Sequence, residues 1–193
     1  MGLRRQKWLI SDYIMNPTMS DIEHLKYPIG KFQKPEVITS SHLNRWIATM
    51  EEFPQLVAQQ LDGVSTSDYD KTYRPGGWSV LQLVHHCADS HMNAFIRFKL
   101  SLTEESPVIR PYLEDRWALL PDVVSIDAEV SLQLLKALHK RWATLLQSLQ
   151  SDDLAREYIH PEHGKRFSLA EATGMYDWHC RHHLEHMKIA LKS

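Results

Sequence analysis

The segment Trp178-His179-Cys180-Arg181-His182-His183-Leu184-Glu185-His186 places four of the chain's 12 histidines within eight residues. On a helix, residues four apart project from one face, so His179 pairs with His183, and His182 pairs equally well with His186. Two imidazoles on one helix face, joined by a third from another helix, make a three-nitrogen site with an open position, as in catalytic zinc centres. The segment therefore predicts a C-terminal helix that binds a metal ion, and it points to an enzyme.

Upstream, three further stretches repeat apolar residues with a helical period. The four predicted helices run from Ser40 or Ser41 to Leu61, from a capping box at Ser79-x-x-Gln82 to about Leu102, from about Asp127 to Leu149, and from a capping box at Ser168-x-x-Glu171 to the C-terminus. Pro54 should kink the first helix because proline has no backbone N–H to donate. No convincing set of strands accompanies these helices, so the predicted fold class is all-α, a four-helix bundle.

The connections between the predicted helices differ in length. Residues 103–126 contain three prolines and form a long irregular crossover between helices two and three, where a simple up-and-down bundle has a short turn. Long loops of this kind often lie over a functional site. Residues 154–167, around Pro161-Glu162-His163-Gly164, predict a small hairpin.

A second histidine pair, His85-His86, falls on the predicted second helix. At about 100° per residue, His86 lies in a polar stripe with Asp89, Asn93 and Arg97, opposite the apolar face. This helix can supply the third imidazole of the site. An unpaired polar group in a core costs about 1–3 kcal/mol. Three inward-facing imidazoles that bind one metal ion avoid this cost.

The other candidate ligands are expected to be ordinary residues. Cys87 and Cys180 each adjoin a candidate ligand, but one residue's step turns a helical side chain about 100° away, so both should be small buried residues. Six histidines have no ligand-like partner by spacing and are interpreted as surface or packing residues: His24, His42, His91, His139, His160 and His163.

Composition narrows the class of protein. The 193 residues, 43% of them hydrophobic, suit one globular domain with a sizeable core. A formal net charge of −2 gives no electrostatic reason to expect a nucleic acid or an anionic membrane as partner, so a small-molecule substrate is the simpler expectation. The two cysteines exclude a secreted disulfide framework, and no stretch approaches the roughly 18 apolar residues of a membrane span. We therefore expect a cytoplasmic protein.

Several longer motifs occur in a fixed order along the chain. They are Tyr27-Pro28-Ile29-Gly30, Tyr73-Arg74-Pro75-Gly76-Gly77-Trp78, Val84-His85-His86-Cys87-Ala88-Asp89-Ser90-His91-Met92-Asn93, Ile96-Arg97-Phe98-Lys99-Leu100, Ile109-Arg110-Pro111-Tyr112 and Trp178-His179-x-x-x-His183. Together they closely resemble the YfiT-like metal-dependent hydrolases of the DinB superfamily, over about residues 27–190. The resemblance implies a DinB-like four-helix bundle, a homodimer, and zinc or nickel held by three histidines.

Carried over position by position, the resemblance implies that the metal ligands are His86, His179 and His183. It also divides the chain into an N-terminal extension, residues 1–26, and a DinB-like metal-binding domain, residues 27–193. The extension departs from the family pattern. We expect it to be loosely ordered and to carry no chemistry.

An open metal site suits more than one reaction. Three neutral imidazoles leave the ion its full charge, so bound water would reach a pKa of about 7 and hydrolysis is the direct use. A substrate thiolate could take the same position, and DinB relatives include transferases that use low-molecular-weight thiols such as bacillithiol. A third interpretation is a non-catalytic metal-binding stress-response protein. In either enzyme, Asp89 could orient an imidazole, and Asn93 and Arg97 are candidate substrate contacts.

Overall fold

The computed structural model describes residues 19–162 and 164–193. In chain order the elements are α1 (Met19–Lys26), α2 (Ser40–Leu61), the 3-10 turn η1 (Thr66–Asp70), α3 (Val80–Thr103), α4 (Glu114–Trp117), α5 (Pro121–Val124), α6 (Ala128–Ser148), α7 (Ser151–Ala155), β1 (Glu157–His160), β2 (Lys165–Ser168) and α8 (Leu169–Lys192). The four long helices α2, α3, α6 and α8 confirm the four predicted ones to within a residue or two. The predicted hairpin is β1 and β2, which pair antiparallel.

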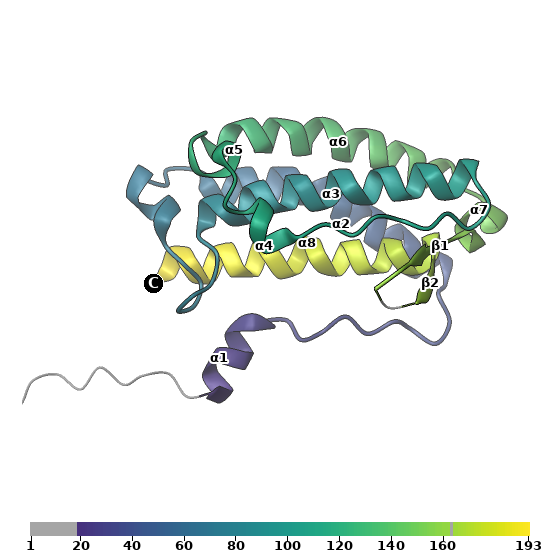
Figure 1. The fold of residues 1–193 in the computed structure, drawn as a ribbon, viewed down its shortest axis with the longest axis horizontal. Coiled ribbons are helices and arrows are strands. Elements are labelled where there is room, and N and C mark those ends of the chain that lie inside the picture. Colours follow the sequence, from purple (N-terminus) through teal and green to yellow (C-terminus); the bar gives the residue numbers. More distant parts are fainter. Residues whose placement is uncertain (1–18, 163) are drawn as a thin grey trace, which may run out of the picture.

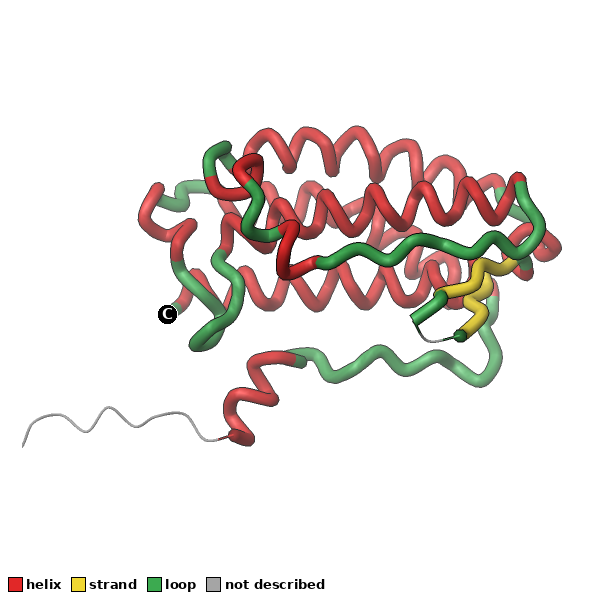
Figure 2. Tube along the Cα trace, viewed as in Figure 1, coloured by secondary structure: helices red, strands yellow, loops and turns green. Residues whose placement is uncertain are grey.

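The four long helices form a bundle in which α2 and α3 each pack against both α6 and α8 (Figure 1). Helices α3 and α6 run in the same direction, and α2 and α8 run in the opposite one. The chain must therefore return the length of the bundle between α3 and α6, which explains the predicted long crossover. This crossover lies along the bundle, carries the short helices α4 and α5, and is otherwise irregular (Figure 2).

Local hydrogen bonds fix where the helices begin. At α3 the Ser79 hydroxyl accepts from the Gln82 N–H at 3.2 Å, and the Gln82 amide oxygen accepts from the Ser79 N–H at 3.0 Å, a complete capping box. At α8 only half of the predicted box forms. The Ser168 hydroxyl accepts from the Glu171 N–H at 3.1 Å, but the Glu171 carboxylate is held by ion pairs with Lys165 and Lys34.

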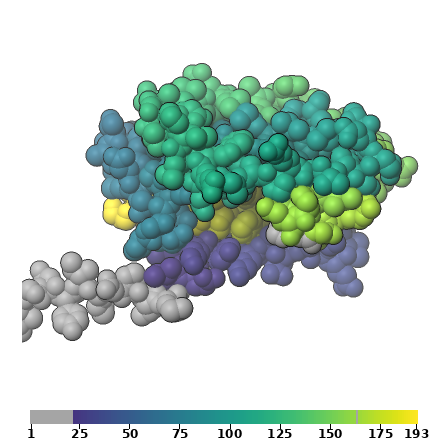
Figure 3. All heavy atoms as spheres, viewed as in Figure 1, coloured from purple at the N-terminus to yellow at the C-terminus, as the bar shows by residue number. Residues whose placement is uncertain are grey.

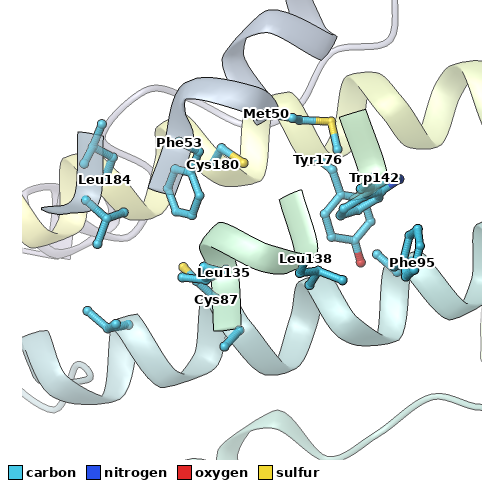
Figure 4. Packing of buried hydrophobic residues seen from close by; sticks show 14 of the residues in the cluster. Met50, Phe53, Cys87, Phe95, Leu135, Leu138, Trp142, Tyr176, Cys180 and Leu184 are labelled. Atoms are coloured by element: carbon cyan, nitrogen blue, oxygen red, sulfur yellow. The ribbon is translucent and has the colours of Figure 1, made fainter. Parts of the chain in front are cut away.

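The core fills the space between the four helices with aromatic and aliphatic side chains (Figure 4). Trp142 of α6 is fully buried and lies with its ring centroid 5.2 Å from that of Tyr176 on α8. Cys87 and Cys180 are buried and unpaired, as predicted. Burial of this kind is the main stabilising term for a bundle whose helices are otherwise amphipathic.

The segment before the bundle runs along α8. Helix α1 and the extended residues 27–39 lie beside α8 in Figure 1. Figure 3 shows α8 between this N-terminal segment and the crossover. The Trp178 indole N–H donates to the Gly30 carbonyl at 2.9 Å, and Lys34 reaches Glu171 at 3.4 Å. Residues 19–26 of the predicted loose extension are thus a helix, whereas residues 1–18 lie outside the described part of the chain. The boundary between residues 26 and 27 stays a prediction.

Within the described residues, every helix is too short or too polar to cross a membrane.

We predict that Gly174→Ala destabilises the protein. Gly174 lies inside α8, and a Cβ there would come within 2.8 to 3.0 Å of the Trp46 ring, which is buried. Overpacking costs up to about 3 kcal/mol, against roughly 1 kcal/mol gained in helix propensity, so the net loss reaches about 2 kcal/mol and the melting temperature should fall by up to about 8 °C. Trp46→Leu in the same chain should relieve the clash, so the two changes should not add. A higher melting temperature for the single variant would contradict this packing.

Candidate metal centre

Three histidines converge between two helices of the bundle, α3 and α8. His86 projects from α3, and His179 and His183 project from successive turns of α8. Each offers a ring nitrogen, and these nitrogens all lie within 4.8 Å of one another. The Nε2 atoms of His86 and His179 are 3.3 Å apart. Two nitrogens bonded to one tetrahedral zinc at about 2.0–2.1 Å would be about 3.3–3.4 Å apart, so the donor set fits such an ion.

The alternative pair on α8 is also part of a histidine group. His182, His183 and His186 bring ring nitrogens within 4.8 Å of one another, and His183 belongs to both groups. The His186 ring stacks on Tyr73 at 3.8 Å and hydrogen-bonds through Nε2 to the Leu25 carbonyl at 3.1 Å. This contact is unexpected, since residues 1–26 were expected to carry no chemistry.

Burial keeps these imidazoles neutral at physiological pH. Desolvation lowers the pKa of His86 to about 4 and that of His186 to about 4. The pKa values of His179 and His183 lie well below the usual range for the same reason, and the neighbouring histidines lower them further. A neutral imidazole has a free lone pair, so no proton has to be removed before these rings can bind a metal ion.

His91 and His139 are buried in the core, as the packing interpretation expected, and they also hydrogen-bond in a series that reaches the histidine group. His91 Nε2 lies 3.0 Å from His179 Nδ1, and His91 Nδ1 lies 2.7 Å from His139 Nε2. His139 Nδ1 in turn hydrogen-bonds to the backbone carbonyl of Met50 on α2. The spacing of Leu135, His139 and Trp142 on α6 was a usable signal, because residues three and four apart share the core-facing side of a helix.

The three predicted catalytic residues lie under the crossover. Asn93 donates to the Asp89 carbonyl at 2.9 Å, and Arg97 lies 3.5 Å from the Arg110 carbonyl. Among the described residues no hydrogen bond joins Asp89 to His86, and the orienting role of Asp89 stays a prediction. Burial, with Asp122 nearby, raises the pKa of Asp89 to about 6. Asn93 and Arg97 line two cavities beneath the crossover, and the catalytic roles of all three residues stay predictions.

A separate cavity of about 410 Å³ opens on the α8 histidines. The residues that line it are three histidines, three other aromatic residues, three charged residues and one glycine: His182, His183, His186, Tyr27, Tyr73, Trp78, Lys26, Arg74, Asp115 and Gly76. Asp115 also lines the cavity that Arg97 borders, so the two spaces adjoin. The cavity gives a small molecule a place beside the histidine group.

Comparison with known proteins matches this arrangement to a family. The sequence profile of the DinB superfamily matches residues 49–187 of the chain. The chain belongs to the DinB superfamily. A relative from Oceanobacillus iheyensis, named by similarity as a metal-dependent hydrolase, is 48% identical over 167 residues, which are 86% of this chain and 96% of the relative. A relative from Bacillus mycoides with the same name is 46% identical over 86% of this chain and 95% of the relative.

Two solved structures agree with the fold. YfiT from Bacillus subtilis, described as a probable metal-dependent hydrolase with an unusual four-helix bundle topology, superposes with a TM-score of 0.83 at 45% identity, covering 86% of this chain and 94% of YfiT. A mycothiol-dependent maleylpyruvate isomerase superposes with a TM-score of 0.60 at 15% identity, covering 75% of this chain and 60% of the isomerase. The second likeness shows a shared fold and no more. The predicted DinB-like bundle and the predicted resemblance are both confirmed.

We predict that the metal-free protein loses stability as the pH falls from 7.5 to 5.5. Eight histidines have a native pKa below the ordinary value of about 6.5, so below pH 6.5 the unfolded chain binds protons that the native protein does not. The raised pKa of Asp89 changes the stability in the opposite direction, but it offsets the effect of only one of these histidines. Urea unfolding with a chelator present should show a loss of at least about 3 kcal/mol at pH 5.5. An unfolding free energy that is flat over this range would contradict the neutral cluster.

Proposed function

We propose that this chain is a metal-dependent hydrolase of a small molecule, with a divalent ion held by His86, His179 and His183. The observation that carries the proposal is the 3.3 Å separation of two neutral imidazole nitrogens beside a third, next to a cavity. A divalent ion with three imidazole ligands lowers the pKa of a coordinated water to about 7 and so supplies the nucleophile at neutral pH. Imidazole suits zinc and nickel alike, so the chain takes one ion of either metal.

The cavity beside the histidines favours a substrate with an anionic group. Arg74 and Lys26 supply two cations to its wall, against the one carboxylate of Asp115. Among the described residues no carboxylate forms an ion pair with Arg74, and its buried Nε has no hydrogen-bond partner. A guanidinium in this state binds a carboxylate strongly. The aromatic rings of Tyr73 and Trp78 would enclose the apolar part of the substrate and exclude water.

The residues under the crossover have a place in the same proposal. The cavity that Arg97 lines adjoins the histidine cavity at Asp115, and the cavity that Asn93 lines shares Pro111 and Tyr112 with the Arg97 cavity, so a longer substrate would extend from the histidine cavity beneath the crossover. Asn93 and Arg97 would then contact its distal end, and Asp89, with its pKa raised to about 6, would be about half protonated near pH 6. A homodimer also belongs to the proposal. It is supported by exposed apolar side chains on the crossover and at the start of α6, which a second copy could cover: Leu113, Leu119, Leu120, Val124 and Val130.

The two alternative interpretations differ from hydrolysis in what occupies the open position. In a thiol S-transferase of the bacillithiol type, a substrate thiolate takes it, and a small thiol should then raise the melting temperature of the metal-loaded protein. In a non-catalytic metal-binding protein no turnover accompanies the metal. A cytoplasmic location suits all three interpretations. Hydrolysis is preferred because His183, one of the three proposed ligands, lines the cavity, and the cations of its wall suit an anionic substrate.

We predict about one metal ion per chain in the wild-type protein and almost none in His86→Ala, His179→Ala or His183→Ala. Each variant removes one of three donors and leaves a site that cannot hold the ion tightly. Elemental analysis beside far-ultraviolet circular dichroism separates metal loss from unfolding, because helix content should change little. His85→Ala is the matched control, since this buried neighbour hydrogen-bonds to Ser131 and belongs to neither histidine group. A His183→Ala protein that keeps its full metal content would refute the ligand set.

We predict that Arg74→Gln removes a preference for anionic substrates. The wild-type protein should hydrolyse 4-nitrophenyl succinate faster than 4-nitrophenyl acetate, and the variant should lose roughly tenfold in kcat/KM on the anionic ester alone, as expected for one lost charged hydrogen bond. Arg141→Gln, which removes an exposed guanidinium of α6 outside the cavity, is the control. Equal losses on both esters would count against a carboxylate site at Arg74.

A further inference from the structure

A chain of three histidines crosses the whole bundle and ends on a backbone carbonyl. It runs from His179 on α8 to His91 on α3, then to His139 on α6, and stops at Met50 on α2. We propose that these three histidines form a positioning relay. The relay fixes the tautomer of His179 and so presents its Nε2 lone pair to the metal ion. The inference rests on the proposed metal site and adds His91 and His139 to it.

The origin of the relay is a proline. In a regular helix the Met50 carbonyl would accept from the N–H of the residue four positions later, but that residue is Pro54, which has none. The Met50 carbonyl is therefore left without its intrahelical donor in the middle of α2. His139 Nδ1 from the facing helix occupies this acceptor. The kinking residue of the sequence thus frees the atom on which the relay ends.

A carbonyl only accepts hydrogen bonds, and this fixes every proton along the chain. His139 must donate from Nδ1, so the Nε2 of the neutral ring is an acceptor. His91 then donates to it from Nδ1 over 2.7 Å, and its own Nε2 is an acceptor. His179 donates from Nδ1 to that atom over 3.0 Å. The remaining nitrogen of His179, Nε2, is left with a lone pair that faces His86 Nε2 at 3.3 Å.

The surroundings leave the two inner rings no other arrangement. His91 and His139 are 0% and 1% exposed, so water cannot replace either partner. The ring of Phe53 packs against both, at 5.4 and 5.5 Å between centroids, and Trp142 closes the other side. Reversing the tautomers would leave the Met50 carbonyl and a ring nitrogen unsatisfied in the core, at about 1–3 kcal/mol for each group.

The second α8 ligand has a shorter relay of the same design. His186 Nε2 donates to the Leu25 carbonyl over 3.1 Å, so its Nδ1 is an acceptor and lies 3.4 Å from His183 Nδ1. His183 therefore holds its proton on Nδ1 and keeps Nε2 free. In this arrangement His186 is a positioning residue and not a ligand, which favours His179 and His183 over the pair His182 and His186. The last residues of α1 take part through a backbone atom.

The experiment compares His139→Phe, His139→Gln and the control His85→Phe. The first removes the acceptor of His91 but keeps a ring in the space, the second restores one acceptor and one donor, and the third alters a buried histidine outside the relay. Zinc affinity is measured by competition with a chromophoric chelator. The ring-nitrogen shifts of 15N-histidine, a direct readout of tautomers, are measured with and without zinc.

We expect His139→Phe to weaken zinc binding by about 10–100-fold, as is typical when an outer partner of a ligand is lost, and His139→Gln to lose less. His85→Phe should bind as the wild type does. In the wild-type protein the signals of His179, His91 and His139 should each report a proton on Nδ1, before zinc is added. Affinity in His139→Phe equal to that of the control, or a proton on His179 Nε2 in the metal-free protein, would overturn the relay. If wild-type protein bound no zinc, the proposed site would fail, and the tautomer spectrum would still decide the relay.

Discussion

A buried imidazole has two polar nitrogens, and in a helical core each one left without a partner costs about 1–3 kcal/mol. This constraint governs the centre of the bundle, where the ring of His91 is enclosed by Phe53, Trp142 and Tyr176. Because the partners of each ring come from another helix, the hydrogen bonds tie together all four long helices. Packing and polar pairing therefore specify the same arrangement, and a shift of one helix along its neighbour would break both.

The helices were predictable from the sequence because the signals that define them are local. Apolar spacing and the cap at Ser79 need only a few neighbouring residues, and the three prolines of the crossover predict an irregular connection. The half-formed cap at Glu171 was not predictable in the same way. Its carboxylate is taken by Lys165 and by Lys34, which is 137 positions away, and no local pattern reports a competition of that range.

The candidate site also has a part that the sequence predicted and a part that it did not. The spacing of His179 and His183, with the family resemblance, was enough to suggest a ligand set that the structure brings together around His86. The partners of those ligands were missed. A histidine at an inward position shows no sign in the sequence of which helix supplies its partner, and the carbonyls of Met50 and Leu25 carry no side-chain signature at all. Only Pro54 hinted at a free carbonyl, since the absence of an N–H is a property of the residue itself.

The division of labour in this fold follows from which parts are rigid. Helices hold the imidazoles, and a metal site needs that precision because its donors must meet within a few tenths of an ångström. The cavity wall, in contrast, comes largely from connections: Arg74 precedes α3, Asp115 belongs to the crossover, and Tyr27 follows α1. Connections change in sequence more easily than packed helices do. A bundle of this kind can therefore hold one metal site on its helices while the connections around Arg74 select the substrate.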